Sequence, residues 1–408
     1  MSVQRVAMLS VHTSPLAQPG AGDGGGMNVY VRSLALHLAR AGVACDVLTR
    51  ADHADQPPTV EVEPGFRVVH LAAGPVASVP KPALPGLVDP FVDAALGFFA
   101  AQREPPGVLH ANYWISGAVG HRLKHELDLP LVATFHTLDR VKAEAGVGDD
   151  PETRARVEGE IVSCADLMIA ATEDERRQLV TLYGAERDRI EVVPPGVEHQ
   201  VFVPGDRRSA RRSLGLDPAG RVLLYVGRIQ PLKGADLAVR ALAELDDDVS
   251  LLVVGGPSGT NGEAQAVALR KLVADLGLDH RVRFIPPQPH DRLVAYYQAA
   301  DVCLVPSRTE SFGLVALEAA ACGTPVVAAD VGGLGSVVDD GETGFLVEGR
   351  AAADYAAPVD VLLSHPDLAR AMGASALARS GRYMWSIAAA RLRRLYGDLA
   401  SRAPVECA

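Results

Sequence analysis

The sequence predicts an α/β protein that contains two doubly wound domains in series. Short apolar runs typical of β-strands alternate with longer helical patterns along the 408 residues, which favours parallel sheets covered by helices on both faces. The Pro- and Gly-rich segment 194–206 interrupts this alternation, which then restarts. We therefore place the first Rossmann-like domain at 1–198 and the second at 199–383, and expect a C-terminal helix of about 384–408 to pack back on the first.

The first half of the chain supplies the strands of one sheet. A helix at 27–41 follows the first apolar run, and helical patterns follow most of the others. The expected strands are 5–10, 46–49, 66–71, 108–111, 131–135, 167–171 and 190–193.

The second half repeats the pattern. Strands are expected at 222–226, 250–254, 282–285, 302–305 and 325–329, with helices at 235–245, 263–276, 291–300 and 312–322 and a helical tail at 366–399. In such sheets, ligands bind at the carboxyl ends of the strands, so we search for functional residues there.

Composition limits the classes of partner. The formal charge of −11 disfavours non-specific binding to nucleic acid or to a membrane surface, which depends on basic patches. The five cysteines form no CxxC pair, so we expect buried free thiols in a reducing cytoplasm. The apolar run 6–11 is too short for a membrane span. We therefore expect a cytoplasmic protein with small-molecule ligands, no nucleic acid and no membrane, and leave a homodimer open.

A glycine-rich loop follows the first strand. Residues 20–26 read GAGDGGG and precede the helix that opens at Met27. Glycines allow the backbone to approach a ligand closely, and a helix N-terminus attracts anions. The spacing is not that of a dinucleotide-binding fingerprint, and a flexible surface loop is the alternative.

Two cations and two carboxylates stand out in the second half. Arg228 and Lys233 follow the strand at 222–226, where they would suit a diphosphate. Glu310 and Glu318 form a Glu-x7-Glu pair, the second of which lies inside the helix expected at 312–322. Eight residues are about two helical turns, so both side chains could face one side. A solvated loop for the cations and an exposed position for Glu318 are the alternatives.

These motifs resemble the GT4 family of retaining glycosyltransferases. The Arg/Lys pair and the Glu-x7-Glu motif are its signature, and the stretches YWISG, GRIQPLKG, VVGGPSG and ESFGLVALEAAACGTPVVAA are similar to those of actinobacterial inositol-phosphate N-acetylglucosaminyltransferases. The matches run from residue 6 to about residue 334. The resemblance implies a GT-B fold, two Rossmann-like domains facing a central cleft, and UDP-N-acetylglucosamine as the favoured donor.

The resemblance also implies roles for individual residues. The catalytic residues would be Arg228, Lys233, His136 and Glu310. The donor-binding residues would be Gly25, Gly26, Arg283, Ile285, Ser311, Phe312, Gly313, Leu314 and Glu318. The acceptor-binding residues would be Asn28, Lys81, Tyr113, Thr137 and Arg154, with Arg156 as the rival of Arg154. Cations with hydroxyl and amide groups suit a phosphomonoester such as 1D-myo-inositol 3-phosphate.

Several loops depart from the family pattern. Residues 110–114 read HANYW where relatives carry HSHYW, residues 81–85 read KPALP for KEELP, and residues 332–335 read GGLG for GGLP. These changes leave open a second reading as an antibiotic-pathway S-glycosyltransferase of the lincosamide type. Such an enzyme would transfer a GDP-activated octose to a small thiol such as ergothioneine.

The expected mechanism is front-face attack without a metal or other cofactor. No motif places a carboxylate beneath the anomeric carbon, so a covalent intermediate is not favoured. The donor's own β-phosphate oxygen would take the acceptor proton, while protein groups position the substrates and stabilise the diphosphate. The alternatives from other classes are a hydrolysing epimerase, a periplasmic-type binding protein and an NAD-dependent dehydrogenase.

Overall fold

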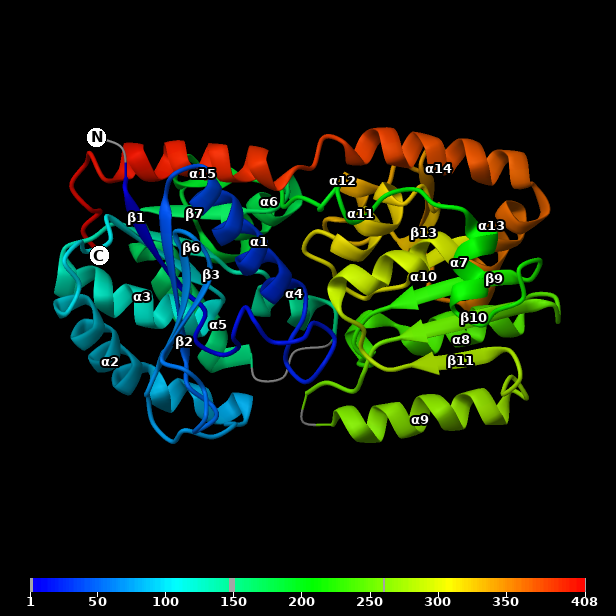
Figure 1. Cartoon of the computed structure of the whole chain (residues 1–408), viewed down its shortest axis with the longest axis horizontal. Helices are drawn as coiled ribbons and strands as arrows, with labels where there is room; N and C mark the ends of the chain where they lie inside the picture. The colour runs from blue at the N-terminus through cyan, green and yellow to red at the C-terminus, as the bar shows by residue number, and fades with distance from the viewer. Residues whose placement is uncertain (1–2, 147–150, 260, 408) are drawn as a thin grey trace. The chain divides into compact units, whose positions relative to one another are not determined.

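The computed structural model describes residues 3–146, 151–259 and 261–407. The chain forms two compact units (Figure 1). Unit 1 comprises Met1–Ala17, Gly26–Gly196 and Trp385–Ala408, and unit 2 comprises Gln18–Gly25 and Val197–Met384.

Unit 1 is built on an eight-stranded sheet of order β3-β4-β2-β1-β5-β6-β7-β8, in which only the β3–β4 pair is antiparallel. Its strands are β1 (Arg5–Leu9), β2 (Ala44–Arg50), β3 (Thr59–Glu63), β4 (Phe66–Leu71), β5 (Val108–Asn112), β6 (Leu131–Thr134), β7 (Leu167–Ala170) and β8 (Ile190–Val192). Its helices are α1 (Gly26–Arg40), α2 (Val88–Ala100), α3 (Trp114–Leu127), α4 (Asp139–Glu144), α5 (Pro151–Cys164), α6 (Glu173–Tyr183) and α15 (Trp385–Leu399), with the 3-10 turns η1 (Lys81–Leu87) and η2 (Arg187–Arg189).

Strand β1 shows why this sheet is covered on both faces. Successive side chains of a strand point to opposite faces, and every other residue of β1 enters a different core. Ala7 and Leu9 belong to a cluster with residues of α2, α3 and α5. Val6 and Met8 belong to a second cluster, with residues of α1 and α15. The sequence prediction of a sheet buried on both faces is confirmed.

The C-terminal helix α15 completes one of these cores. It lies alongside α1 (Figure 1). The Trp385 ring meets Tyr30 edge-on, with centroids 5.6 Å apart. The Tyr396 hydroxyl lies 2.6 Å from Nδ1 of His110, whose Nε2 lies 2.8 Å from Oγ1 of Thr134. A helix distant in sequence is thus fixed to the centre of the sheet by a buried hydrogen-bond chain.

The buried histidine of this hydrogen-bond chain, His110, makes the stability of unit 1 depend on pH. Burial lowers the pKa of His110 to about 3, against about 6.5 in an unfolded chain. The unfolded state therefore binds a proton below pH 6.5 that the folded state does not, and stability falls as the pH falls from there. Urea unfolding measures the free energy of unfolding at each pH. Between pH 7.5 and pH 5, we expect this free energy to fall by about 2 kcal/mol more in the wild type than in His110→Gln.

The control for this experiment is the exposed residue His53. The variant His53→Gln should keep the pH dependence of the wild type. Equal pH dependence in His110→Gln and the wild type would contradict the prediction.

One segment of the described residues, Lys81–Ala100, is long and apolar enough by length and composition to cross a membrane. In the structure it forms η1 and then α2. Phe91, Val92, Ala95 and Phe99 of α2 lie buried in the core of unit 1. Packing against the sheet accounts for the apolar face of this helix.

Unit 2 contains a six-stranded, fully parallel sheet of order β11-β10-β9-β12-β13-β14. Its strands are β9 (Arg221–Val226), β10 (Val249–Val254), β11 (Val282–Ile285), β12 (Val302–Val305), β13 (Val326–Ala329) and β14 (Gly344–Val347). Its helices are α7 (Arg207–Ser213), α8 (Ala235–Ala243), α9 (Gly262–Asp275), α10 (Leu293–Ala299), α11 (Leu314–Ala321), α12 (Leu334–Val337), α13 (Ala352–Ser364) and α14 (Pro366–Ser380), with the turns η3 (Pro231–Lys233) and η4 (His290–Arg292).

The cysteine prediction is wrong for one pair. Cys45, Cys303 and Cys322 are buried free thiols as expected. Cys164 and Cys407, however, form a disulfide across 243 residues of sequence. Spacing in the sequence could not indicate this pair, because only the folded path of the C-terminal tail brings Cys407 to the end of α5.

Candidate functional site

Arg228 and Lys233 follow strand β9, as the sequence predicts. A guanidinium nitrogen of Arg228 donates to Oγ of Ser258 over 3.2 Å, and its carbonyl accepts from the Tyr225 hydroxyl over 3.0 Å. Lys233 is the last residue of η3, and its Nζ lies 2.6 Å from Oε2 of Glu310. Both cations are thus held in place at the carboxyl end of β9.

The glycine loop belongs to this same unit. A Cβ atom added to Gly25 would lie 3.4 Å from Nε of Arg228 and 3.5 Å from its Cζ. Such distances are ordinary van der Waals contact, so Gly25 lies directly against the Arg228 guanidinium.

Of the Glu-x7-Glu pair, Glu318 lies on a helix and Glu310 does not. Helix α11 begins at Leu314, after Gly313 with φ of +101°. Glu310 lies before it, in the turn after β12, where its carbonyl accepts from the Gly333 amide over 2.8 Å. A helix cannot continue backwards through Gly313, because its positive φ lies outside the right-handed helical region. Glycine adopts such a φ readily, whereas residues with side chains rarely do. Ser311 and Phe312 lie in the turn as well, and Phe312 is buried.

Glu318 is buried rather than exposed. Its Oε1 lies 2.7 Å from Nε2 of His290, and its Oε2 accepts from the Tyr297 hydroxyl over 2.6 Å. Burial lowers the pKa of His290, but the Glu318 carboxylate outweighs it and leaves this pKa above its usual value. Burial and the same carboxylate raise the pKa of Tyr297. A carboxylate accepts about four hydrogen bonds, so Glu318 has capacity for further donors.

Strand β11 carries Arg283 and Ile285. The side chain of Arg283 donates to the Leu214 carbonyl over 2.9 Å. Ile285 is buried at the end of the strand. The Arg283 side chain is exposed apart from this hydrogen bond.

Three of the five expected acceptor residues meet in unit 1. Arg154 is buried, and its guanidinium donates to Oγ1 of Thr137 over 3.1 Å and to the Tyr113 hydroxyl over 3.2 Å. Its Nε donates to Oε1 of the fully buried Glu158 over 2.7 Å. The rival Arg156 is instead exposed and pairs with Glu160 on the same helix. The structure therefore brings Arg154, Tyr113 and Thr137 together.

The other two acceptor candidates lie on separate segments. Asn28, in the first turn of α1, is buried and donates to Oγ1 of Thr13 over 2.9 Å and to the Ser14 carbonyl over 2.6 Å. Lys81 is partly exposed at the start of η1. The loop before it is held by the buried Arg50, which donates to the carbonyls of Pro75 and Ala77.

His136 follows strand β6 with a left-handed φ of +62°. Its Nε2 lies 3.0 Å from Oδ1 of Asn112, and its ring meets Tyr30 edge-on. Burial, then the neighbouring His110, lower the pKa of His136 to about 3. The imidazole is therefore neutral at physiological pH, and it donates to Asn112 rather than carrying charge. A non-glycine residue with positive φ is a feature of functional sites.

Sequence reasoning did not identify several residues that support these groups. They are Ser258, His290, Tyr297, Asn112 and Glu158. Asn112 carried a signal, since it lies at a strand end in the HANYW stretch. Ser258 carried one as well, since it lies in the VVGGPSG stretch, and Glu158 follows Arg154 at the i,i+4 spacing of a helical ion pair. His290 and Tyr297 carried none, because their contacts depend on packing between separate elements.

Comparison with known protein families and solved structures shows the class of protein to which this fold belongs. The Glycosyl transferase 4-like domain matches residues 25–196, and Glycosyl transferases group 1 matches residues 206–379. The sucrose-phosphate synthase from Thermosynechococcus elongatus is 35% identical with a TM-score of 0.92, over 98% of this chain and 99% of that one. The Anabaena protein HepE, solved with UDP and glucose, shares the fold at 22% identity with a TM-score of 0.78, over 97% and 100% of the two chains. The fold is that of a two-domain GT-B glycosyltransferase.

Curated relatives narrow the class to one family. The D-inositol 3-phosphate glycosyltransferase of Geodermatophilus obscurus is 52% identical over 394 residues, which cover 94% of this chain and 86% of that protein. The enzyme of the same name from Acidothermus cellulolyticus is 49% identical over 407 residues, which cover 97% and 90%. The chain belongs to this family of glycosyltransferases.

Proposed function

We propose that the chain is a retaining glycosyltransferase that moves N-acetylglucosamine from UDP-N-acetylglucosamine to 1D-myo-inositol 3-phosphate, the first step of mycothiol biosynthesis. The observation that best supports this acceptor is that Arg154 donates hydrogen bonds to the side chains of Tyr113 and Thr137. A buried guanidinium with two hydroxyl groups suits the oxygens of a phosphomonoester. Lys81 and Asn28 would complete that pocket, and the names of the relatives support the same acceptor.

The donor would bind to unit 2. Arg228 and Lys233 would neutralise its diphosphate, and Gly25 and Gly26 would let the backbone approach its sugar and phosphate. The amides from Ser311 to Leu314 and the Glu310 side chain would hold the phosphate and the hexose. The ion pair between Lys233 and Glu310 supports this division, because each side chain already orients the other. The backbone of Arg283 and Ile285 would contact the base.

Glu318 would accept the ribose hydroxyls. Its fixed carboxylate between His290 and Tyr297 supports this role, since both oxygens are oriented before any donor arrives. We expect Glu318→Gln to raise the KM for the donor by about 10- to 100-fold, because a hydrogen bond to a charged group contributes about 1.5–3 kcal/mol. The KM for the acceptor should stay near the wild-type value. An unchanged donor KM would contradict the assignment.

Retention would follow from front-face attack. The acceptor hydroxyl would lose its proton to the β-phosphate oxygen of the donor as the glycosidic bond breaks. Arg228 and Lys233 would stabilise the charge that develops on the leaving diphosphate. The neutral His136 would contact the donor hexose through a hydrogen bond rather than through charge. In this proposal no metal or other cofactor takes part.

One observation favours a second donor sugar. Asn112, which departs from the family pattern, is the residue that hydrogen-bonds His136. A change beside the residue expected to contact the hexose would alter the choice of sugar. The second candidate is therefore the S-glycosyltransferase of the lincosamide type, with a GDP-activated octose and a thiol such as ergothioneine.

The deciding experiment is a turnover assay on the purified protein. UDP-N-acetylglucosamine is supplied with and without D-inositol 3-phosphate, and UDP release and product mass are followed in buffer with and without a metal chelator. Acceptor-dependent formation of a disaccharide phosphate, unchanged by chelator, is the expected result. Acceptor-independent UDP release would indicate an epimerase or hydrolase. No turnover by folded protein would remove this substrate pair, and GDP-sugars with thiol acceptors would then be assayed.

We further propose that the protein acts in the cytoplasm on small molecules, without nucleic-acid or membrane partners. The net charge of −11 supports the absence of polyanion binding. Size-exclusion chromatography with light scattering would decide between a monomer and a homodimer.

A further inference from the structure

Unit 1 contains a cluster of two cysteines and two histidines, away from the residues discussed so far. His121 and His125 lie one turn apart on α3, and Cys164 is the last residue of α5. Cys407 comes from the C-terminal tail. The potential ligand atoms of all four side chains lie within 4.8 Å of one another.

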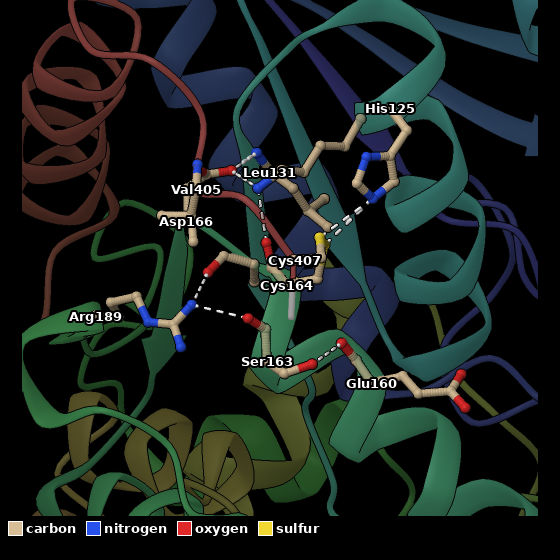
Figure 2. The surroundings of a disulfide bond; sticks show 11 residues. His125, Leu131, Glu160, Ser163, Cys164, Asp166, Arg189, Val405 and Cys407 are labelled. Carbon is tan, nitrogen blue, oxygen red and sulfur yellow. Dashed lines mark hydrogen bonds and ion pairs between the residues drawn. A yellow bond between two sulfur atoms is a disulfide. The ribbon is translucent and has the colours of Figure 1, made fainter.

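Two nitrogen–sulfur distances in this cluster are close to those between the ligands of a zinc site. Nε2 of His125 lies 3.2 Å from the sulfur of Cys407 and 3.5 Å from that of Cys164. Figure 2 shows the His125 ring directed at both sulfurs. Around a tetrahedral zinc ion, with Zn–N of about 2.0–2.1 Å and Zn–S of about 2.3 Å, nitrogen and sulfur ligands lie about 3.5 Å apart. Two of the required separations are thus already present.

The tail does not depend on the disulfide alone for its position. The backbone amide of Val405 donates to one carboxylate oxygen of Asp166. The other oxygen accepts from Nζ of Lys124 over 2.8 Å and from the amide of Leu131 over 2.7 Å (Figure 2). Lys124 and Asp166 are both buried. This network holds the tail beside α3 and α5, so reduction of the disulfide would leave Cys407 near its ligand position.

We propose that, when the disulfide is reduced, Cys164, Cys407, His121 and His125 bind one zinc ion. A dithiol reductant would convert the protein disulfide to two thiols and become a disulfide itself. Zinc would then displace the two thiol protons and bind two thiolates and two neutral imidazoles. The complete centre carries no net charge, since two thiolates balance Zn²⁺, and it can therefore form at a partly buried position without an uncompensated charge.

The zinc ion would have a structural role. Four protein ligands close the coordination sphere, which is the arrangement of structural rather than catalytic zinc. The ion would join α3 and α5 to the C-terminal tail. The sequence predicted no metal. His121 and His125 have the spacing of a ligand pair on a helix, but Cys164 and Cys407 come from two other segments, which residue spacing does not connect to them.

The test uses the full chain, reduced with a phosphine and purified free of metal. Zinc is added in the presence of a chromophoric competing chelator, and native mass spectrometry counts the ions bound. We expect one zinc per reduced chain and none in the oxidised protein. His125→Ala keeps both cysteines and should weaken binding by about a hundredfold or more, since partners in the outer shell alone change affinity 10–100-fold. The matched control is His53→Ala, which removes an exposed histidine elsewhere.

Cobalt(II) gives an independent measurement on the same samples. A tetrahedral site with two thiolates should show strong visible absorption and a thiolate-to-cobalt charge-transfer band, and Cys407→Ser should lose it. Circular dichroism confirms that each variant is folded, and His121→Ala replaces His125→Ala if the latter is not. Reduced protein that takes up no zinc, or zinc binding that survives both the histidine and the cysteine substitution, would overturn the proposal.

Discussion

Replacing Arg228 by alanine is expected to reduce kcat by about 10²–10³-fold, the loss typical of removing one preorganised group that stabilises developing charge. The guanidinium donates to Ser258 at the end of β9 and lies against Gly25. The other cation that follows β9, Lys233, is paired with Glu310. Nucleotide release in steady state measures the effect. Arg228→Lys should recover part of the activity, because it restores the charge without the planar geometry.

The control for this variant is Arg208→Ala, which removes an exposed arginine of the same unit. It should retain full activity and the same thermal unfolding as the wild type. If Arg228→Ala turns over near the wild-type rate while folded, the diphosphate assignment is refuted.

Replacing Arg154 by methionine is expected to destabilise unit 1 by about 3–5 kcal/mol, the cost typical of leaving one member of a buried ion pair without its partner. Glu158 is fully buried, and in the described part of the chain it also accepts from the Asp139 amide and the Tyr183 hydroxyl. Those two bonds do not neutralise its charge. Urea unfolding measures the loss of stability, and Arg156→Met, at an exposed position, is the matched control.

A double variant separates stability from function at this position. Arg154→Met with Glu158→Gln removes both charges of this pair and should recover part of the lost stability, since glutamine can still accept from Asp139 and Tyr183. The buried Asp139 carboxylate, 3.9 Å from Nε of Arg154 in the wild type, remains without that cation. The KM for the phosphorylated acceptor should remain raised in the double variant, because Tyr113 and Thr137 lose the guanidinium. Recovery of both stability and acceptor KM would show that Arg154 acts only in folding.

Most of the fold could be predicted from the sequence, because buried parallel strands are short apolar runs between helical patterns. Two strands were missed, β3 (Thr59–Glu63) and β14 (Gly344–Val347). Both are edge strands of their sheets. Edge strands are paired on one side only and need less apolar sequence, so β3 is largely polar on its exposed face. Residues 381–384 divide the helical tail expected at 366–399 into α14 and α15, and α15 lies within the C-terminal helix expected at about 384–408.

The candidate site was predictable as motifs but not as contacts. The sequence indicated that Arg228 and Lys233 follow a strand, and β9 confirms it. It expected a helix at 312–322, whereas α11 begins at Leu314, because residue spacing cannot reveal the left-handed Gly313 before it. It gave no sign of His290 and Tyr297 around Glu318, since these pairs form only when η4 and α10 pack on α11. Local sequence patterns therefore predict helices and strands, whereas the hydrogen-bond partners of a side chain depend on how those elements pack.

The path of the chain has a consequence for synthesis on the ribosome. Helix α15 contributes Trp385, Leu392 and Tyr396 to a core of unit 1 that otherwise consists of residues 3–193. Domains usually fold in the order in which they emerge. Here residues 197–384 of unit 2 leave the ribosome while one face of the unit 1 sheet still lacks its covering helix. Nascent chains arrested before residue 385 should therefore expose that apolar face to chaperones, and the first domain to begin folding is the last to finish.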